Sequence, residues 1–373
     1  SFLGKLLLKR WVSLSQESRC MLLKNWLSSV LANEQGLAAI ELEPMTGDAG
    51  FRQYYRFKLK GQSLIAVDAP PQYSNNQAFV AIGQALTNEN LNVPKIIALD
   101  LQQGFFCLTD FGNQLLADSL QKNNGDVDIH KVYSQAIRLL PAISKANIVK
   151  NPDNVLKEVN NQYQLPIYDQ GFIELELEIF TQWLLEKHLN IQLSPDDQQQ
   201  LMQCFSCLTV SALSQPKVTM HRDFHSRNIM VLNDNSLGII DFQDAVIGPI
   251  TYDIVSLLRD CYSRWPDSLI QPLFNDFCQL MTQQYSLEDV TEQQWQQWFD
   301  LMGIQRHLKA SGIFCRLYYR DNKGSYLNDI PLTLSYIEEI SAKYPQLSFL
   351  HHLIKSQVLP AMQLLNDKES DNL

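Results

Sequence analysis

The segment that decides the fold begins with His221-Arg-Asp-Phe-His-Ser-Arg-Asn228 and continues through Ile229-Met-Val-Leu232 to Leu237-Gly-Ile-Ile-Asp241. A polar loop precedes two short apolar runs that a polar turn separates, and this is the pattern of a β-hairpin. The start of the first strand and the end of the second strand meet at the same end of a hairpin. We therefore expect Asp223, Asn228 and Asp241 to lie together.

These three side chains suit a particular chemistry. Two carboxylates and an amide oxygen fit a hard divalent cation such as Mg²⁺, which takes oxygen ligands and keeps several waters. A carboxylate that does not bind the metal is able to accept a proton from a hydroxyl group. Each residue also has a structural interpretation: Asp223 as a turn residue bonded to backbone N–H groups, and Asn228 with Asp241 as a polar pair at the hairpin end.

The same residues resemble the catalytic loop and the metal-binding aspartate of the protein-kinase superfamily. His221-Arg-Asp223 is followed by Asn228 at the spacing of kinase catalytic loops. Phe242-Gln243 and the segment 248–258 are more similar to aminoglycoside and choline phosphotransferases. Within that superfamily the chain resembles bacterial kinases that phosphorylate the anomeric hydroxyl of N-acetylmuramate and N-acetylglucosamine. The resemblance covers about residues 15–345, and further strings that carry it are Gly47–Arg56, Asp68–Pro71, Asp241–Ala245 and Gly303–Phe314.

The resemblance implies an α+β, protein-kinase-like bilobal fold with a small antiparallel β-sheet lobe and a larger, mainly helical lobe. Residues 1–108 would form the first lobe, with an N-terminal helix and a nucleotide-binding loop, and residues 109–373 the second, with the catalytic loop and the acceptor site. The implied cofactors are ATP and Mg²⁺, with Asp223 as the catalytic base and Asn228 and Asp241 as metal ligands. The implied acceptor is an amino sugar of peptidoglycan recycling.

The resemblance also implies where the nucleotide binds. The loop Gly47-Asp48-Ala49-Gly50-Phe51 lies between two expected strands and would lay backbone N–H groups over the phosphates. A plain hairpin turn explains its sequence nearly as well. Main-chain groups near Leu108, Thr109 and Asp110, at the hinge between the lobes, are expected to hold the adenine.

Further residues are implied around the acceptor. His225 and Arg227, inside the catalytic loop, and Asp244, beyond it, are candidates for contact with the substrate or the transferred phosphoryl group. For Asp244 a role in a local turn is an equal alternative. We expect His221 to pack the loop and Asp253 to anchor it from the start of the next helix.

The phosphate site departs from the kinase pattern. Kinases hold the α- and β-phosphates with a Lys on the third strand, paired with a Glu on the neighbouring helix. The corresponding strand, 64–68, contains no Lys, and the expected helix 75–88 contains no Glu. Arg52 and Arg56 are the nearest cations, and their even spacing places both on one face of a strand. That face either contacts the phosphates or is a solvated surface. The missing Lys keeps a non-catalytic pseudokinase as an alternative, beside an aminoglycoside, choline or homoserine kinase.

Composition excludes several functions for this chain of 373 residues. Thirty Lys and Arg against forty Asp and Glu give a net charge of −10 without a basic stripe, so we expect neither nucleic acid nor an anionic membrane as a partner. Seven cysteines, of which only Cys204 and Cys207 have metal-site spacing, indicate reduced thiols and a cytoplasmic protein. No apolar run reaches the roughly 18 residues that a membrane helix needs.

Hydrophobic periodicity predicts the elements around these motifs. A first helix is expected around Leu22–Val30, followed by β-like runs over 38–68 and strands at 95–99 and 105–108. After Gly112 the pattern is helical, apart from a β-rich island over 218–247. The expected helices are 128–145, 171–188, 196–213, 252–263, 266–283, 292–313, 332–343 and one near 349–365.

Overall fold

The computed structural model describes residues 18–31, 40–45, 51–121, 128–148 and 163–370. Its contacts divide the chain into two compact units. The first consists of Ser1–Gln114, Asn147–Gln164 and Met230–Gln243, and the second of Leu115–Ala146, Leu165–Ile229 and Asp244–Leu373. The segment Met230–Gln243, far along the chain, thus belongs to the same unit as the N-terminal segment. The expected division into 1–108 and 109–373 has a single boundary and does not include this exchange.

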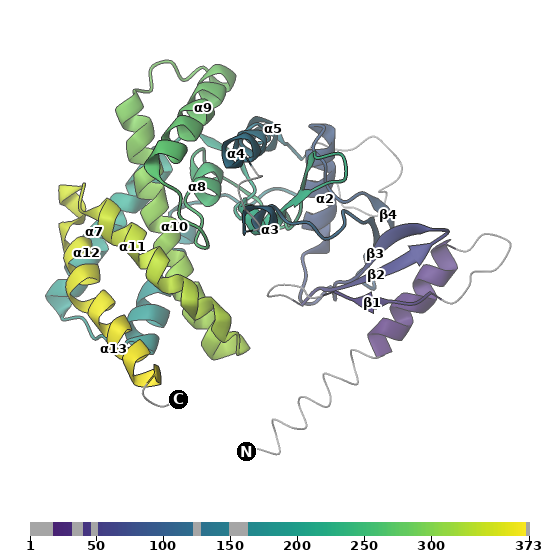
Figure 1. Ribbon diagram of the computed structural model, residues 1–373, viewed down its shortest axis with the longest axis horizontal. Coiled ribbons are helices and arrows are strands. Elements are labelled where there is room, and N and C mark those ends of the chain that lie inside the picture. Colours follow the sequence, from purple (N-terminus) through teal and green to yellow (C-terminus); the bar gives the residue numbers. More distant parts are fainter. Residues whose placement is uncertain (1–17, 32–39, 46–50, 122–127, 149–162, 371–373) are drawn as a thin grey trace. The chain divides into compact units, whose positions relative to one another are not determined.

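The first unit is built on a five-stranded sheet in the order β1-β2-β3-β5-β4 (Figure 1). All neighbouring strands are antiparallel. Lys60 and Gly61 form the tight turn between β2 and β3 with φ angles of 50° and 82°, and Gly61 adopts this left-handed conformation without steric cost. The strands are β1 Glu43–Pro44, β2 Gln53–Leu59, β3 Gln62–Asp68, β4 Ile96–Asp100 and β5 Phe105–Thr109.

Two helices cover opposite faces of this sheet. A helix over residues 18–31 packs Trp26 and its apolar neighbours against Phe57 and Phe105. Successive side chains of a strand point to opposite faces, and Phe106 accordingly contacts Phe79 of α2, with ring centroids 5.4 Å apart. Helix α2, Asn76–Asn88, begins where the Asn75 side chain accepts a hydrogen bond from the Ala78 amide. The expected helices at both positions are confirmed.

The hairpin predicted after the catalytic loop is present as β7 (Ile229–Val231) and β8 (Leu237–Ile239). Leu232 N donates to Ser236 O across its turn at 2.9 Å. The hairpin is tied to the first unit through Asn92, whose backbone oxygen accepts from Ile239 N at 2.8 Å and whose side chain donates to Leu237 O at 3.1 Å.

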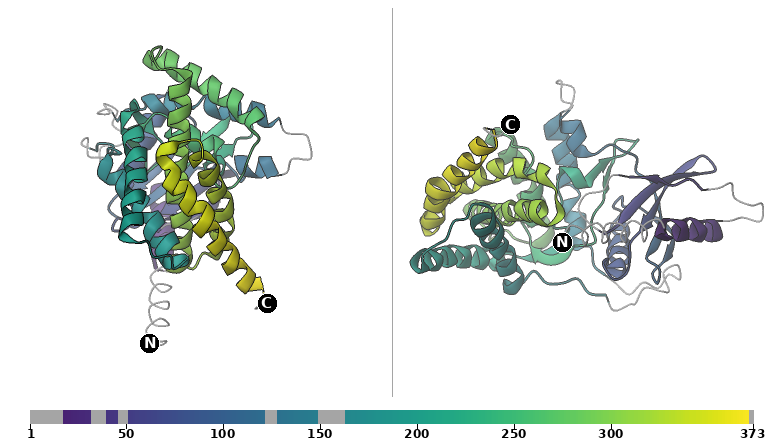
Figure 2. Two further views of the ribbon diagram at one scale, coloured as in Figure 1. Left: turned by 90° about the vertical axis from the view of Figure 1, so that its left-hand side faces the viewer. Right: turned by 90° about the horizontal axis from the view of Figure 1, so that it is seen from below.

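The second unit is mainly helical, with α10 at its centre in contact with α6, α7, α8 and α11 (Figure 1 and Figure 2). A two-stranded sheet of β6 and β9 carries the catalytic loop. The α-helices are α3 Leu116–Gln121, α4 Ile129–Ile137, α5 Leu140–Lys145, α6 Gln170–Ile179, α7 Pro195–Ser214, α8 Tyr252–Leu258, α9 Asp267–Tyr285, α10 Glu292–Asp321, α11 Ile330–Ser341, α12 Ser348–Leu353 and α13 Leu359–Ser370. The remaining elements are the π-helices η2 Phe180–His188 and η6 Ile354–Val358, the 3₁₀ turns η3 Ser226–Asn228, η4 Gly324–Asp329 and η5 Pro345–Leu347, and the strands β6 Lys217–Met220 and β9 Val246–Pro249.

Most predicted helices are present, with differences in extent, continuity and type. Helix α8 ends at Leu258, α10 continues to Asp321, and the helix expected near 349–365 is divided into α12, η6 and α13. The expected helix 128–145 is divided into α4 and α5. Pro141 lies in the first turn of α5, where the lack of an amide hydrogen costs no hydrogen bond of the helix. The expected helix 171–188 becomes a π-helix from Phe180 onward, and α3 was not predicted. The predicted fold class, a small antiparallel sheet with a mostly helical remainder, is confirmed.

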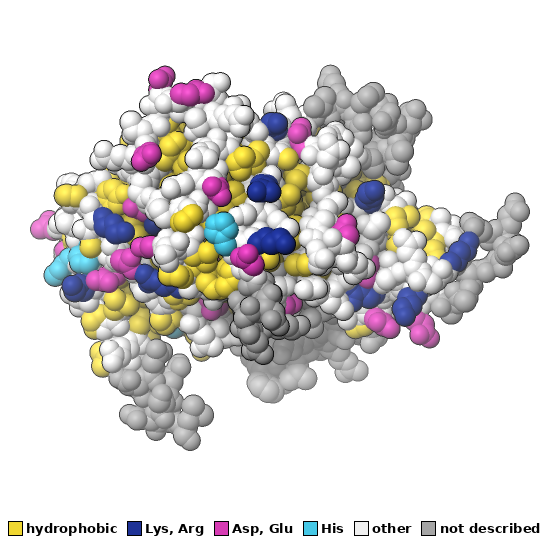
Figure 3. Space-filling view, turned by 45° about the horizontal axis from the view of Figure 1, so that its top comes forward, with side chains coloured by type: hydrophobic (Ala, Val, Ile, Leu, Met, Phe, Trp, Pro, Cys, Tyr) yellow, Lys and Arg dark blue, Asp and Glu magenta, His cyan; other side chains and the backbone are white. Residues whose placement is uncertain are grey.

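The charged side chains on one face of the molecule are of both signs, as the composition of the chain leads us to expect. On the face shown in Figure 3, described Lys and Arg side chains alternate with Asp and Glu, without a continuous basic surface. Among the described helices, none combines the length and the apolar character needed to cross a membrane. All seven cysteines lie within the described residues, and none of them forms a disulfide.

Candidate active site

The catalytic loop is held by hydrogen bonds between its backbone and one carboxylate. It follows β6, whose last residue Met220 pairs with Val246 of β9. The Asp253 carboxylate, in the first turn of α8, accepts hydrogen bonds from the backbone amides of His221 at 2.7 Å and Arg222 at 2.9 Å. Arg222 has a φ of 79°, a conformation that costs energy in a residue with a Cβ and is concentrated at functional sites. The predicted anchoring role of Asp253 is confirmed.

Asp223 is held in its ionised form by neighbouring positive charges. Burial raises its pKa, but the charges of Lys309, His225, Arg222 and Arg306 outweigh this effect and lower the pKa to about 2. Asp223 itself bonds within the loop only through its backbone groups. Among the residues that the structure describes, none donates a hydrogen bond to its carboxylate. The loop therefore presents an ionised carboxylate whose oxygens are not used by the fold.

A buried ion-pair network connects this loop to helices α6 and α10. Glu176 of α6 accepts from Arg222 Nη2 at 2.7 Å and pairs with Lys309 Nζ of α10 at 2.8 Å. Its second oxygen accepts from the Tyr168 hydroxyl at 2.6 Å and from Gln305 Nε2 at 3.1 Å. Burial raises the pKa of Glu176, but the two cations lower it to about 2. Removing one member of such a buried pair typically costs about 3–5 kcal/mol.

Neither Glu176 nor Lys309 was predicted as a site residue, although the sequence contains a signal for Glu176. Ile173 and Leu177 of α6 are buried, and Glu176 lies three residues after Ile173 on the same helical face. An acid on an apolar face requires a partner. Gly312 allows the partner helix to come close, because a Cβ at this position of α10 would overlap the backbone of Ile179.

The other loop residues make contacts within the second unit. Asn228 Nδ2 donates to the Asp223 backbone oxygen at 3.0 Å, which orients the amide. The rings of His225 and Tyr262 are 5.8 Å apart, and the Arg227 guanidinium lies 3.4 Å from the centre of the Tyr262 ring. Asp244 is exposed in the turn before β9. His225 and Arg227 thus share one aromatic neighbour, whereas Asp244 lies in a different segment.

Asp241 belongs to the first unit. It follows β8 with a φ of 63°, its side chain is exposed, and its Oδ1 accepts from Gln243 Nε2 at 2.7 Å. The next residue, Phe242, is fully buried and stacks on Phe79 of α2 with ring centroids 5.1 Å apart. A Cβ at Gly83 would come within 3.2 Å of the Phe242 ring. Packing on α2 thus holds a left-handed backbone at Asp241, a second strained site residue.

Arg56 has a different partner from the expected one. Its Nε and Nη2 donate to the two carboxylate oxygens of Asp110 at 2.7 and 3.0 Å, and Nη1 donates to Asn113 Oδ1 at 2.5 Å. Asp110 also accepts from Ser63 Oγ at 2.6 Å and from Gly112 N at 2.9 Å. Phosphate binding by Arg56 would require this ion pair to open and stays a prediction.

The remaining predicted nucleotide residues are only partly described. Gly47, Asp48, Ala49 and Gly50 lie outside the described residues, while Phe51 is exposed and stacks on Tyr73 with ring centroids 4.6 Å apart.

Arg52 donates to Asn75 O at 3.3 Å, and its guanidinium lies 4.9 Å from the centre of the Phe79 ring. Leu108 lies within β5, paired with both β3 and β4, and the Thr109 amide donates to Lys95 O at 3.0 Å. A nucleotide contact at Thr109 would therefore have to use its carbonyl oxygen.

The strand that lacks the kinase Lys carries an acid instead. Asp68 is the last residue of β3, and its carboxylate accepts from Arg19 Nε at 2.9 Å. Arg19 belongs to the helix over residues 18–31 and also lies 5.0 Å from the centre of the Phe105 ring. The charge at this strand end is thus neutralised by an N-terminal helix, an arrangement that the sequence did not reveal.

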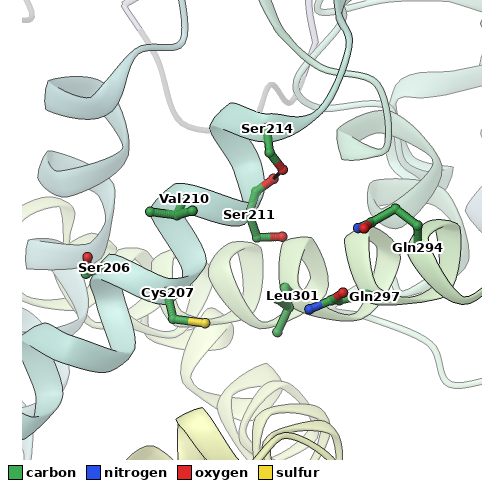
Figure 4. Close-up of a pocket in the computed structure, with 8 residues that line it drawn as sticks. All are labelled: Ser206, Cys207, Val210, Ser211, Ser214, Gln294, Gln297 and Leu301. Atoms are coloured by element: carbon green, nitrogen blue, oxygen red, sulfur yellow. Dashed lines mark hydrogen bonds between the residues drawn. The ribbon is translucent and has the colours of Figure 1, made fainter. Parts of the chain in front are cut away.

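A separate hollow of the second unit lies between α7 and α10 (Figure 4). Serine hydroxyls and glutamine amides line it together with Cys207, Val210 and Leu301. None of its lining residues is a carboxylate, a histidine or a cation. This hollow offers no group for acid–base chemistry, and the catalytic loop contributes no residue to it.

The chain is similar in sequence to proteins of known activity. Residues 41–287 match the phosphotransferase enzyme family. The N-acetylmuramate/N-acetylglucosamine kinase of Pseudomonas aeruginosa is 34% identical over 349 residues, which cover 92% of this chain and 98% of that protein. The kinases of the same name from Pseudomonas putida and Neisseria meningitidis are 36% and 32% identical, over 84% and 93% of this chain and 87% and 96% of theirs.

Solved kinases share the fold. Plasmodium vivax ethanolamine kinase superimposes with a TM-score of 0.56 at 15% identity over 84% of each chain. Choline kinase of Streptococcus pneumoniae gives a TM-score of 0.55 at 13% identity, over 86% of this chain and 98% of that one. These neighbours confirm the kinase-like fold. The resemblance first seen in the catalytic loop extends over most of the sequence, and the chain belongs to the phosphotransferase enzyme family.

Proposed function

We propose that this protein transfers the γ-phosphoryl group of ATP to the anomeric hydroxyl of N-acetylmuramate and N-acetylglucosamine. The observation that carries the proposal is the Asp223 carboxylate, which is ionised and, among the described residues, receives no hydrogen bond. The substrate class follows from the names of relatives that are 32% to 36% identical over most of this chain.

In the proposed reaction, the sugar oxygen attacks the γ-phosphorus, the bond to the β–γ bridging oxygen breaks, and ADP leaves. Asp223 accepts a hydrogen bond from the anomeric hydroxyl and thereby orients it. A carboxylate with a pKa of about 2 is a weak base. The proton therefore moves from the hydroxyl to Asp223 late, once the forming P–O bond has made the hydroxyl acidic. Phosphoryl transfer has a loose transition state, so positioning supplies most of the acceleration.

For the nucleotide, we infer that ATP binds along the first unit. Solved proteins of this fold carry AMP, GDP or ADP, including a choline kinase and two aminoglycoside phosphotransferases. We still propose that the backbone N–H groups of the loop Gly47, Asp48, Ala49 and Gly50 bind the phosphates. Arg52 is a better candidate than Arg56 for a phosphate contact, because Arg56 is already paired with Asp110.

For the metal, we infer that Asn228 and Asp241 bind Mg²⁺ together with phosphate oxygens. The oxygen donors fit this ion, and Asp241 is exposed on a backbone held in a left-handed conformation. The described residues contain no cluster of three or more His, Cys, Asp or Glu able to hold a metal, so Asn228 and Asp241 would supply only part of the ligands. When bound, Mg²⁺ neutralises charge between the transferred and leaving groups. Nucleotide affinity that rises equally with Mg²⁺ in the wild type and in Asp241→Ala would exclude Asp241.

The preference for an amino sugar over choline or an aminoglycoside rests on the names of the relatives. Around Asp223, Lys309 and Arg222 are both paired with Glu176. A non-catalytic pseudokinase would have no use for an ionised carboxylate held without hydrogen bonds. We expect the reaction in the cytoplasm, where ATP is present.

The acceptor is tested by incubating the protein with ATP, Mg²⁺ and a panel of N-acetylated sugars, aminoglycosides and amino alcohols. We expect phosphorylation of the two N-acetylated sugars only, at the anomeric oxygen. Proton-coupled phosphorus NMR locates the phosphate, and 1-O-methyl analogues, which lack the reacting hydroxyl, serve as controls. A 6-phosphate product, or turnover of an aminoglycoside, would contradict the proposed substrate and leave the family and fold intact.

A further inference from the structure

The partly buried Arg222 and the buried Arg259 and Arg306 of the second unit differ in how their charge is balanced. Arg222 Nη2 donates to Glu176 at 2.7 Å, and Arg259 Nη2 donates to Asp300 Oδ1 at 2.6 Å. Arg306 of α10 is only 9% exposed. Among the described residues, none accepts a hydrogen bond from its Nε or Nη1. The two paired arginines are explained by the fold, and the third is not.

Two of the carboxylates near Arg306, those of Asp260 and Asp253, already accept hydrogen bonds from other groups. Asp260 accepts from Ser226 Oγ at 2.7 Å and from Tyr262 N at 3.1 Å. Asp253 accepts from the backbone amides of the catalytic loop. Arg306 also lies over the ring of Tyr252, with the ring centre 5.3 Å from the guanidinium carbon. An aromatic face attracts a cation but does not accept its directional N–H bonds.

Burying a cation without a hydrogen-bonded counter-charge is costly. By contrast, Lys309, three residues further along the same helix, forms an ion pair with Glu176. The positive charge of Arg306 also acts on Asp223, whose pKa it helps to lower. Arg306 is thus a buried guanidinium with N–H groups that lack an acceptor, beside the carboxylate to which we assign the chemistry, and this arrangement indicates a ligand site.

We propose that Arg306 binds an oxyanion of the molecule on which Asp223 acts. A guanidinium whose Nε and Nη1 have no acceptor suits an oxygen of a carboxylate or a phosphoryl group, to which it donates a charge-assisted hydrogen bond. Two sources share this chemistry: the carboxylate of an acidic sugar, or the phosphoryl group during its transfer. The inference rests on the proposed function, since it takes Asp223 as the reacting centre.

Arg306→Gln tests the proposal, with kinetics measured on N-acetylmuramate, which carries a carboxylate, and on N-acetylglucosamine, which does not. If the carboxylate is the ligand, KM for N-acetylmuramate rises about tenfold or more, as expected for a lost charge-assisted pair, and N-acetylglucosamine is unaffected. If the phosphoryl group is the ligand, kcat falls by a similar factor with both sugars. Unchanged kinetics with both sugars would overturn the proposal.

Two further variants separate function from folding. Arg320→Gln removes the same charge from an exposed position of α10, where Arg320 is paired with Asp321, and should leave the kinetics unchanged. Thermal unfolding should show a cooperative transition for Arg306→Gln with a melting temperature close to that of the wild type, because the change removes both the cost of burying the charge and its attraction to Asp223. If Arg306→Gln fails to fold, Arg306→Lys decides. Lys keeps the charge but not the fixed N–H donors of the guanidinium, so it should lose part of the activity, and full activity would overturn the proposal.

The outcome stays distinguishable from a failure of the proposed function. If the wild type phosphorylates neither sugar, the proposed substrate is wrong, and the oxyanion site is then tested with inorganic phosphate alone. Phosphate should raise the melting temperature of the wild type and of Arg320→Gln but not that of Arg306→Gln. An equal rise in all three proteins would overturn the proposal independently of any turnover.

Discussion

Asp110 of the first unit and Asp223 of the second are both aspartates whose pKa is lowered, for different physical reasons. For Asp110, burial raises the pKa and direct hydrogen bonds from Arg56, Ser63 and the Gly112 amide lower it. For Asp223, burial likewise raises the pKa, but charges at a distance lower it to about 2. Asp110 therefore has its oxygens occupied, while no described residue donates to the Asp223 carboxylate.

The difference between a structural and a reactive carboxylate therefore lies in whether hydrogen bonds within the fold occupy its oxygens. A carboxylate whose lone pairs are filled by an Arg and a Ser stabilises the fold but has little capacity left for a substrate. A carboxylate kept ionised by cations that are themselves bonded elsewhere keeps its oxygens for a ligand. In the second unit that task falls to Lys309 and Arg222, both of which bond to Glu176.

The largest expected effect comes from removing each carboxylate in turn. Asp223→Asn should lower kcat by about 10²–10⁴-fold, the usual contribution of a positioned acid–base group, with little change in nucleotide affinity. Asp110→Asn should keep kcat close to that of the wild type, because its proposed role in nucleotide binding uses only the main chain. Steady-state kinetics at saturating substrate checks both variants. Near-normal turnover in Asp223→Asn would make the two aspartates equivalent and the assignment wrong.

The second prediction concerns pH and stability. The pKa of Asp223 is about 2 in the folded protein, against an ordinary value of 3.8. Since the folded state binds the proton more weakly, ionisation stabilises it by about 2 kcal/mol above roughly pH 4, and this stabilisation is lost as the pH falls toward 2. The free energy of unfolding of Asp223→Asn should therefore lie about 2 kcal/mol below that of the wild type at pH 7. Urea unfolding from pH 7 to pH 3 should show the gap narrowing, and a constant gap would contradict the charge argument.

The smallest expected effects separate the two arginines of the first unit. Arg56→Ala strands the Asp110 carboxylate, which is only 5% exposed, and should lower the free energy of unfolding by about 1–3 kcal/mol. Arg52→Ala should change stability by less than about 1 kcal/mol and raise KM for ATP up to about tenfold, the value of one charge-assisted hydrogen bond.

Lys58→Ala, at an exposed position of the same strand β2, is the control for both arginine variants. Calorimetry and initial rates measure the two properties separately. An Arg52 variant with the KM of this control would remove Arg52 from the phosphate site.

Much of the fold was predictable because its signals are local. The hairpin after the catalytic loop, the helix before the sheet and most helices after Gly112 follow from hydrophobic periodicity and turn residues. The change to a π-helix at Phe180 and the short helix α3 were not predicted. Six residues such as Leu116–Gln121 are too few for a periodic pattern to be recognised.

The candidate site was predictable to a different degree. Asp223 and Asn228 lie in one short loop, and the spacing to Asp241 was readable along the chain. The ion-pair partners of the charged residues could not be predicted from the sequence. Arg56 and Asp110 are separated by 54 positions, and Arg222 and Glu176 by 46, so no local pattern connects them.

By itself, the sequence determined which chemical groups this protein has and in which order: a His-Arg-Asp loop, an Asn, a hairpin and a second Asp. Only the tertiary structure decided which charges are neutralised. Strand register and helix packing bring Arg56 to Asp110 and both Arg222 and Lys309 to Glu176. They leave the Nε and Nη1 of Arg306 without an acceptor among the described residues. The physical reason is that ion pairing depends on distances of a few ångströms between atoms. Those distances are set by contacts between elements far apart in the chain.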